Sequence, residues 1–187
     1  MPGPVSIETL IDKALELGFS HAGQAAVETL KPRVEVRDMC AVDKCHAYDR
    51  TWTCPPGCGT LEECGEKMHR YDFGILAQTT AQLEDSMDYE GMMQGEQDQK
   101  ERSKKYLAYL REHYDDVLPL TAAGCQICKT CTYPDAPCRF PHEAVSAMEG
   151  YGLLVSQVCK DNDILYYYGQ NTVTYTALFL IRKSSVH

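Results

Sequence analysis

Apolar residues recur every three or four positions in several stretches of this 187-residue chain, and each such stretch predicts an amphipathic helix. Near the start, Leu10, Ile11 and Ala14 follow Ser6, a residue type that favours the N-cap position. The sequence therefore predicts a first helix over residues 7–17. A long helix is predicted over 88–117, where the chain is polar and helix-prone and apolar residues gather late, and shorter helices are predicted over 142–149 and 154–159.

Other stretches alternate apolar and polar residues, and this spacing predicts strands. Such stretches lie within 19–39 (around Val34 and Val36) and at 71–77, 118–122, 164–168 and 172–181. The last two flank Gly169-Gln170-Asn171, residue types that favour a turn, so we expect them to pair as a hairpin. The end of 172–181 is apolar on both faces, which is typical of a strand in the centre of a sheet.

Strands and helices in this order predict an α+β fold. We expect a single compact domain over 1–187, with a small mixed or antiparallel sheet and flanking helices. Two cysteine-rich stretches fall in predicted loops at strand ends, and we name them the first cysteine segment (residues 40–64) and the second cysteine segment (residues 125–141). Cys159 lies outside both segments, on the apolar face of helix 154–159, and is predicted to be a buried core thiol.

The second cysteine segment has a regular spacing. Cys125, Cys128 and Cys131 recur at every third residue, and Cys138 follows after six intervening residues. A cubane iron–sulfur cluster needs one thiolate for each of four irons, and bacterial ferredoxins use three evenly spaced cysteines and a fourth followed by proline. Here the proline is Pro141, three residues after Cys138. The spacing predicts a 4Fe–4S cluster held by these four cysteines.

Zinc is the main alternative in this segment. A tetrahedral zinc ion usually takes two thiolates from each of two separated pairs. Four cysteines within fourteen residues, three of them evenly spaced, fit a polynuclear cluster better than a single ion. Disulfides and free thiols are further alternatives.

The first cysteine segment contains five cysteines with irregular spacing: Cys40, Cys45, Cys54, Cys58 and Cys64. Prolines and glycines over 55–59 exclude a regular element there and stiffen the loop. We expect the first three cysteines to be ligands of a second cluster, with either Cys58 or Cys64 as the fourth. A single structural metal ion, or thiols packed as small apolar groups, are the alternatives.

Charge and composition exclude several classes of partner. The chain has 27 acidic and 18 basic residues, a net charge of −9, whereas nucleic-acid-binding proteins present a basic face. The sequence begins without a basic segment followed by an apolar run, and the apolar stretch 177–181 is too short to cross a bilayer. We therefore expect no nucleic-acid or membrane partner, and a location in the reducing cytoplasm, where clustered cysteines are more often metal ligands than disulfides.

Several short motifs occur together in this chain: Arg37-Asp-Met-Cys40, Trp52-Thr-Cys54-Pro-Pro, Cys131-Thr-Tyr-Pro and Tyr167-Tyr-Gly169-Gln-Asn171-Thr. In combination, and over nearly the whole chain, they resemble the cysteine-rich prokaryotic proteins described as predicted metal-binding, domain of unknown function 2284. The resemblance implies a metal or iron–sulfur protein. It points to seven matching cysteines: Cys40, Cys45, Cys54, Cys125, Cys128, Cys131 and Cys138.

The expected function is electron transfer or a redox accessory role, because the sequence has no glycine-rich dinucleotide or phosphate loop. The redox partner, a protein or a small molecule, and the oligomeric state stay open. An alternative is a redox enzyme in which the cluster of the first cysteine segment has an open position for a small substrate. His46, Tyr48 and Trp52 could line such a pocket, although aromatic residues are more often part of a core. The third possibility is a zinc-stabilised binding module.

Overall fold

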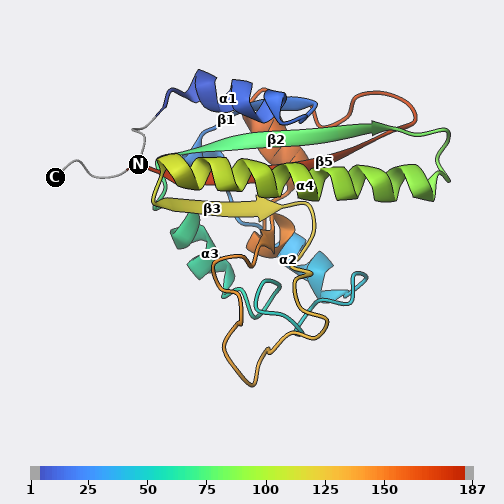
Figure 1. The fold of residues 1–187 in the computed structure, drawn as a ribbon. Helices are drawn as coiled ribbons and strands as arrows, with labels where there is room; N and C mark the ends of the chain where they lie inside the picture. Colours follow the sequence, from blue (N-terminus) through green and yellow to red (C-terminus); the bar gives the residue numbers. More distant parts are fainter. Residues whose placement is uncertain (1–4, 184–187) are drawn as a thin grey trace.

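The computed structural model describes residues 5–183, in which five strands form one mixed sheet with helices on both faces (Figure 1). The α+β class is therefore confirmed. In chain order the elements are α1 (Ile7–Glu16), β1 (His21–Ala25), η1 (Val27–Thr29), α2 (Val34–Ala41), α3 (Leu61–Met68), β2 (Phe73–Gln82), α4 (Tyr89–His113), β3 (Asp116–Thr121), β4 (Ser146–Ala147), η2 (Glu149–Tyr151), α5 (Val155–Asp161) and β5 (Thr172–Arg182).

The strands lie in the order β1-β2-β5-β3-β4, and all neighbours are antiparallel except β3 and β4. The predicted central position of the last strand is confirmed, because β5 pairs with β2 on one side and β3 on the other. Residues of β5 alternate between two cores. Ala177, Phe179 and Ile181 face the core under α1 and α4, while Leu178 and Leu180 face the core under α3, η2 and α5.

The long helices follow the sequence prediction closely. Ser6 caps α1, since its hydroxyl oxygen accepts a hydrogen bond from the Thr9 N–H at 3.2 Å, and Asp88 caps α4 in the same way through Gly91. Buried Tyr106 and Leu110 anchor α4 on the sheet. Within residues 5–183 we find no helix with both the length and the apolar character to cross a membrane.

The strand predicted around Val34 and Val36 is wrong, because these residues begin helix α2. Val36 is 2% exposed whereas Val34 is 60% exposed, so the two valines do not share one face of a strand. The strand of this region is β1 instead, at the edge of the sheet. Alternation over only two apolar residues is too short to separate a strand from a helix turn.

Two further predictions near the C-terminus are wrong. Residues 142–149 do not form a helix: Ser146 and Ala147 pair with β3, and the Met148 N–H bonds the Thr121 carbonyl at 3.1 Å. Residues 164–168 are not a strand either. Both edges of β5 are already occupied by β2 and β3, so no position is left for a hairpin partner.

Candidate metal centre

The two cysteine segments lie side by side on the side of the sheet opposite α1 (Figure 1). Two hydrogen bonds from side-chain donors join them: the Trp52 indole N–H donates to the Ala136 carbonyl at 3.0 Å, and the Tyr133 hydroxyl donates to Asp49 at 3.0 Å. The Trp52 and Tyr133 rings also meet edge to face, with centroids 4.9 Å apart. The fold thus brings together cysteines that are far apart in the sequence.

Two glycines permit this close approach. A Cβ atom on Gly57 would collide with the Thr51 carbonyl oxygen and lie 3.0 Å from the Tyr133 ring. A Cβ atom on Gly124, which precedes the second segment, would lie 3.2 Å from the Cys54 sulfur. Gly57 therefore has no room for a side chain, and at Gly124 a side chain would have to displace the Cys54 sulfur.

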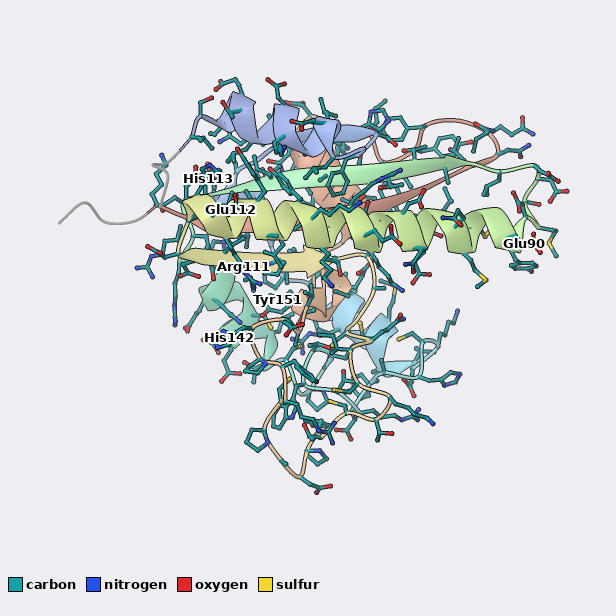
Figure 2. All side chains as sticks on the ribbon, in the orientation of Figure 1. Glu90, Arg111, Glu112, His113, His142 and Tyr151 are labelled. Atoms are coloured by element: carbon teal, nitrogen blue, oxygen red, sulfur yellow. The ribbon has the colours of Figure 1, made fainter. Side chains whose placement is uncertain are left out.

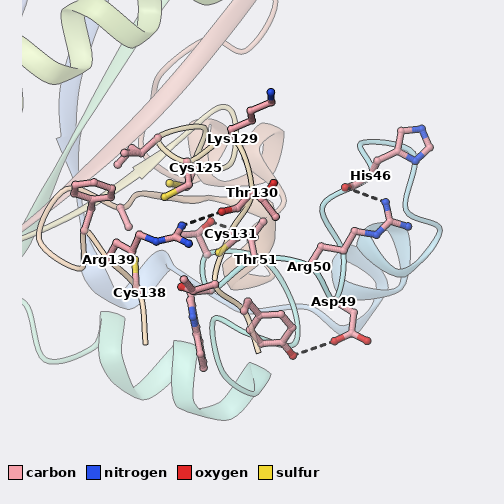
Figure 3. Close-up of a pocket in the computed structure, with 18 residues that line it drawn as sticks. His46, Asp49, Arg50, Thr51, Cys125, Lys129, Thr130, Cys131, Cys138 and Arg139 are labelled. Carbon is pink, nitrogen blue, oxygen red and sulfur yellow. Dashed lines mark hydrogen bonds between the residues drawn. The ribbon is translucent and has the colours of Figure 1, made fainter. Parts of the chain in front are cut away.

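All four cysteines of the second segment line one cavity of about 450 Å³. Cys125, Cys128, Cys131 and Cys138 contribute to its walls, and Figure 3 shows Cys125, Cys131 and Cys138 around it. The Arg139 guanidinium crosses the loop and donates to the Thr130 carbonyl at 3.0 Å. Backbone direction in this loop, rather than a regular element, turns the four thiols toward a common space.

Cys131 has the environment of a thiolate. Burial raises the pKa of its thiol, but the backbone N–H groups of Tyr133, Trp52 and Thr132, together with the positive charge of Arg139, outweigh burial and lower it. Donors aimed at sulfur favour its charged form. One of these donors, the Trp52 N–H, comes from the first segment, so contact between the segments helps to prepare the second site.

Three cysteines of the first segment face a neighbouring cavity of about 720 Å³: Cys40, Cys45 and Cys54. Cys40 lies in α2, Cys45 is exposed in the following loop, and Cys54 is buried. Cys125 lines both cavities, so it stands in the wall between them. The expectation that this segment is all loop is wrong at its ends, because Cys40 belongs to α2 and Cys64 to α3.

The thiols of Cys40, Cys45 and Cys54 have surroundings that favour binding of a cation. Burial raises the pKa of Cys40, and negative charge on Glu149, Cys45 and Cys54 raises it further. Burial also raises the pKa of Cys54, against hydrogen bonds from the Thr51 and Thr53 hydroxyls. Neighbouring thiolates repel one another, and the charge of a bound metal ion reverses this effect and stabilises them. The residues present therefore fit a metal group.

Cys58 and Cys64 form a separate pair beside the Arg37 guanidinium. Arg37 Nη2 lies 3.2 Å from the Cys64 sulfur, 3.7 Å from the Cys58 sulfur and 3.0 Å from the Gly59 carbonyl oxygen. A hydrogen bond from the Cys58 thiol, with help from Arg37, outweighs burial and lowers the pKa of Cys64 to about 7. Donating that hydrogen bond stabilises the protonated form of Cys58, and together with burial it raises the pKa of Cys58.

All ten cysteines are free thiols. Across residues 5–183, no three His, Cys, Asp or Glu side chains stand close enough together to hold one metal ion. The sulfurs are instead spread around the two cavities. Cys159 is 0% exposed, as predicted for a core thiol, and its sulfur accepts a hydrogen bond from Gln78 at 3.5 Å.

The model of one protein family, described as predicted metal-binding protein (DUF2284), matches residues 25–181. The chain belongs to this family. The family predicted from the motifs is thus confirmed. No curated protein matches this DUF2284 protein significantly. Among solved structures, epoxyqueuosine reductase from Bacillus subtilis is similar over 96% of this chain and 46% of its own, with 10% identity and a TM-score of 0.43. The chain thus spans less than half of that enzyme's length.

Of the three aromatic and histidine candidates for a pocket at the first site, His46 and Tyr48 line the cavity of that site and Trp52 does not. Trp52 lines the smaller cavity, Tyr48 lines the larger one, and His46 is exposed in the wall of both. Sequence reasoning about this DUF2284 protein missed the contact of Arg37 with two thiols. It also missed the hydroxyls around Cys54. The sequence holds no local signal for the first, because Arg37 is 21 residues from Cys58 and 27 residues from Cys64, and backbone direction decides the second.

Proposed function

We propose that this protein is an iron–sulfur protein that carries one or two 4Fe–4S clusters and serves in electron transfer or as a redox accessory protein. The observation that carries the proposal is the lining of one cavity by Cys125, Cys128, Cys131 and Cys138. Sulfurs spread around a space of about 450 Å³ suit a polynuclear group. A tetrahedral zinc ion needs every sulfur about 2.3 Å away, and these thiols would have to converge to reach it.

The residues around the second segment would hold and tune such a cluster, which supplies one-electron transfer when bound. Cys131 receives three backbone N–H groups, which lower the pKa of its thiol and so favour the thiolate that a metal binds. Lys129 and Arg139 add positive charge at the same cavity. Positive charge and N–H donors near the sulfurs stabilise the reduced, more negative cluster and so raise its potential.

A cluster at the first site, in the first cysteine segment, would use Cys40, Cys45 and Cys54, which share the larger cavity. The fourth ligand would be either Cys58 or Cys64, which lie together beside Arg37. We propose that the whole chain forms one domain around the two sites. Ten free thiols also support a reducing cytoplasm as its location.

One observation favours a second candidate function, a redox enzyme with an open position at the first site. Cys58 and Cys64 pair with Arg37 and do not line the cavity that Cys40, Cys45 and Cys54 share. A cluster with three fixed thiolates would leave one position for a small molecule, as catalytic zinc sites do. His46 and Tyr48 line that cavity and could contact such a molecule.

Metal analysis of anaerobically purified protein tests the proposal. We expect about four irons and four acid-labile sulfides for each occupied site, with no zinc. Cys128→Ser should lose the iron of the second site. Cys159→Ala is the matched control, because this thiol lies in the core and should leave the iron content unchanged. Stoichiometric zinc without sulfide would overturn the proposal in favour of the zinc-stabilised binding module.

The fourth ligand of the first site is tested separately, with Cys58→Ala and Cys64→Ala. If one variant loses about four irons, that cysteine completes the site and the electron-transfer reading stands. If both variants keep their iron, the first site has an open position or a ligand other than cysteine, which supports the enzyme.

A further inference from the structure

We propose that a third cavity, between α4 and the start of the second cysteine segment, binds a small organic molecule with an apolar body and one anionic group. We call it the α4 cavity. Its volume is about 510 Å³, within the range of about 300–1,000 Å³ typical of small-molecule sites. Six residues of α4 form one wall, spaced as a single face of the helix: Lys100, Ser103, Lys104, Leu107, Ala108 and Arg111.

The base of the α4 cavity is apolar. Leu107 and Phe179 are buried there, and Pro119, Val145 and Ile127 are among the other apolar residues of the lining. An apolar lining with a small number of placed polar groups is the usual composition of a ligand pocket. This part of the cavity would receive the hydrocarbon body of the ligand.

The rim of the α4 cavity is basic in a chain whose net charge is −9. Lys100, Lys104 and Arg111 line it, against Glu143 as the one acidic lining residue that is described. This concentration of positive charge favours an anion over a cation or a neutral molecule. Figure 2 shows Arg111 on α4 and His142 on the segment that lies below it.

Two of the three basic side chains, Lys104 and Arg111, are not paired with a carboxylate of the described residues. Lys100 is already engaged, at 2.6 Å from Glu96 and 2.8 Å from the Gln126 side-chain oxygen. Arg111 donates at 2.7 Å to the His142 carbonyl, a neutral acceptor, so its charge is not balanced by a carboxylate. Lys104 makes no hydrogen bond or ion pair with any residue in 5–183. Lys104 and Arg111 are therefore available to an anionic group.

Ser103 supplies the independent observation that points to a ligand. Its side chain lines the α4 cavity, the residue is 5% exposed, and its hydroxyl oxygen has no hydrogen-bond partner among the described residues. A buried hydroxyl without a partner is unfavourable, and a helical serine usually bonds the carbonyl four residues earlier instead. This hydroxyl oxygen is itself covered by neighbouring atoms, so a ligand oxygen in the cavity would become its partner once a small side-chain movement uncovers it.

The α4 cavity also touches the candidate metal centre, because Gly124, Cys125 and Gln126 form part of its wall. A molecule bound there would lie beside a thiol that faces both cluster cavities. If the proposed function holds, the bound molecule is a candidate for the small-molecule redox partner. Binding itself does not depend on which metal is present.

Calorimetric titration of anaerobically purified, full-length protein tests the proposal. The probes are 4-phenylbutyrate and phenyl phosphate, with 4-phenyl-1-butanol and inorganic phosphate as partial analogues. We expect one of the two aromatic anions to bind one to one, and both partial analogues to bind about tenfold or more weakly. A carboxylate or a phosphate preference identifies the head group, and either result supports the site. Failure of both aromatic anions to bind overturns it.

Variants locate the binding. Lys104→Gln should weaken it about tenfold by removing the free charge, and Ala108→Phe should abolish it by filling the cavity from an exposed position. Lys105→Gln is the matched control, since Lys105 is exposed on α4 and does not line the cavity. Equal losses from Lys104→Gln and Lys105→Gln, or normal binding by Ala108→Phe, would refute the assignment.

Metal content is measured on the same preparations. A preparation without iron that still binds the anion would contradict the iron–sulfur function and leave the α4 cavity supported. An iron-loaded preparation that binds no probe would contradict the ligand site in the α4 cavity and leave the iron–sulfur function supported. The two proposals can therefore fail independently.

Discussion

Replacing Gly124 by alanine tests whether close contact between the two cysteine segments positions a metal ligand. The new Cβ atom would lie 3.2 Å from the Cys54 sulfur, which is tighter than ordinary van der Waals contact, so the sulfur has to move by a few tenths of an ångström. The backbone at Gly124 does not have a positive φ, so alanine causes no strain of its own. The perturbation is therefore confined to the position of Cys54.

The size of the effect differs between stability and metal binding. Crowding of a packed site costs about 1–3 kcal/mol, and loss of glycine freedom in the unfolded chain returns about 0.4–1 kcal/mol. At about 2–4 °C per kcal/mol for a chain of this length, metal-free Gly124→Ala should unfold within roughly 10 °C of the parent. Changes beside a ligand typically cost about 10–100-fold in metal affinity.

The assay is loss of metal to a chelator, followed under anaerobic conditions. We expect Gly124→Ala to release the metal of the first site at a chelator concentration about 10–100-fold lower than the parent. Gly150→Ala is the matched control, because its Cβ atom would meet only ordinary contacts, at 3.5 Å from the Thr53 carbonyl oxygen. If Gly124→Ala and Gly150→Ala both retain metal like the parent, Cys54 is not a ligand whose position matters.

Three further substitutions have defined outcomes. In metal-free protein, Arg37→Gln should raise the pKa of the Cys64 thiol above about 7, because the cation that favours the thiolate is removed. Ultraviolet titration should then show less Cys64 thiolate at neutral pH. An unchanged titration would contradict the assigned role of Arg37. Tyr106→Phe removes the hydrogen bond from a buried hydroxyl to the Leu10 carbonyl. Chemical denaturation should show that the free energy of unfolding falls by about 1 kcal/mol, with metal content unchanged. An unchanged free energy of unfolding would show that α1 does not depend on this bond. Cys159→Ala should lower the thermal midpoint by a few degrees, because it empties part of a packed core, and loss of iron in this variant would refute its purely structural role.

The spacing of apolar residues along the chain was sufficient to predict the long helices and the long strand β5. The apolar stripe of α1 and its capping Ser6 correctly predict a helix, and the polar, helix-prone stretch whose apolar residues gather late correctly predicts α4. The apolar end of β5 likewise predicts its central place, since only a strand covered on both faces buries both sets of side chains. The motifs also identified the family.

Short or isolated patterns failed where distant contacts decide the structure. Residues 142–149 have a helical spacing, but pairing of Ser146 and Ala147 with β3 takes their backbone groups instead. Residues 164–168 alternate as a strand would, yet both edges of β5 are occupied before that segment could reach it. Propensity over so few residues is weaker than one set of sheet hydrogen bonds.

The sequence by itself determined the inventory of the candidate metal centre: nine cysteines in two segments, their spacing, and a core thiol at Cys159. Only the tertiary structure decided how they group. It separates Cys58 and Cys64, beside Arg37, from the thiols around the larger cavity, and it gives Cys131 a donor from the other segment. Spacing along a chain limits which thiols can meet, but the direction of each sulfur depends on contacts between segments that are distant in the sequence.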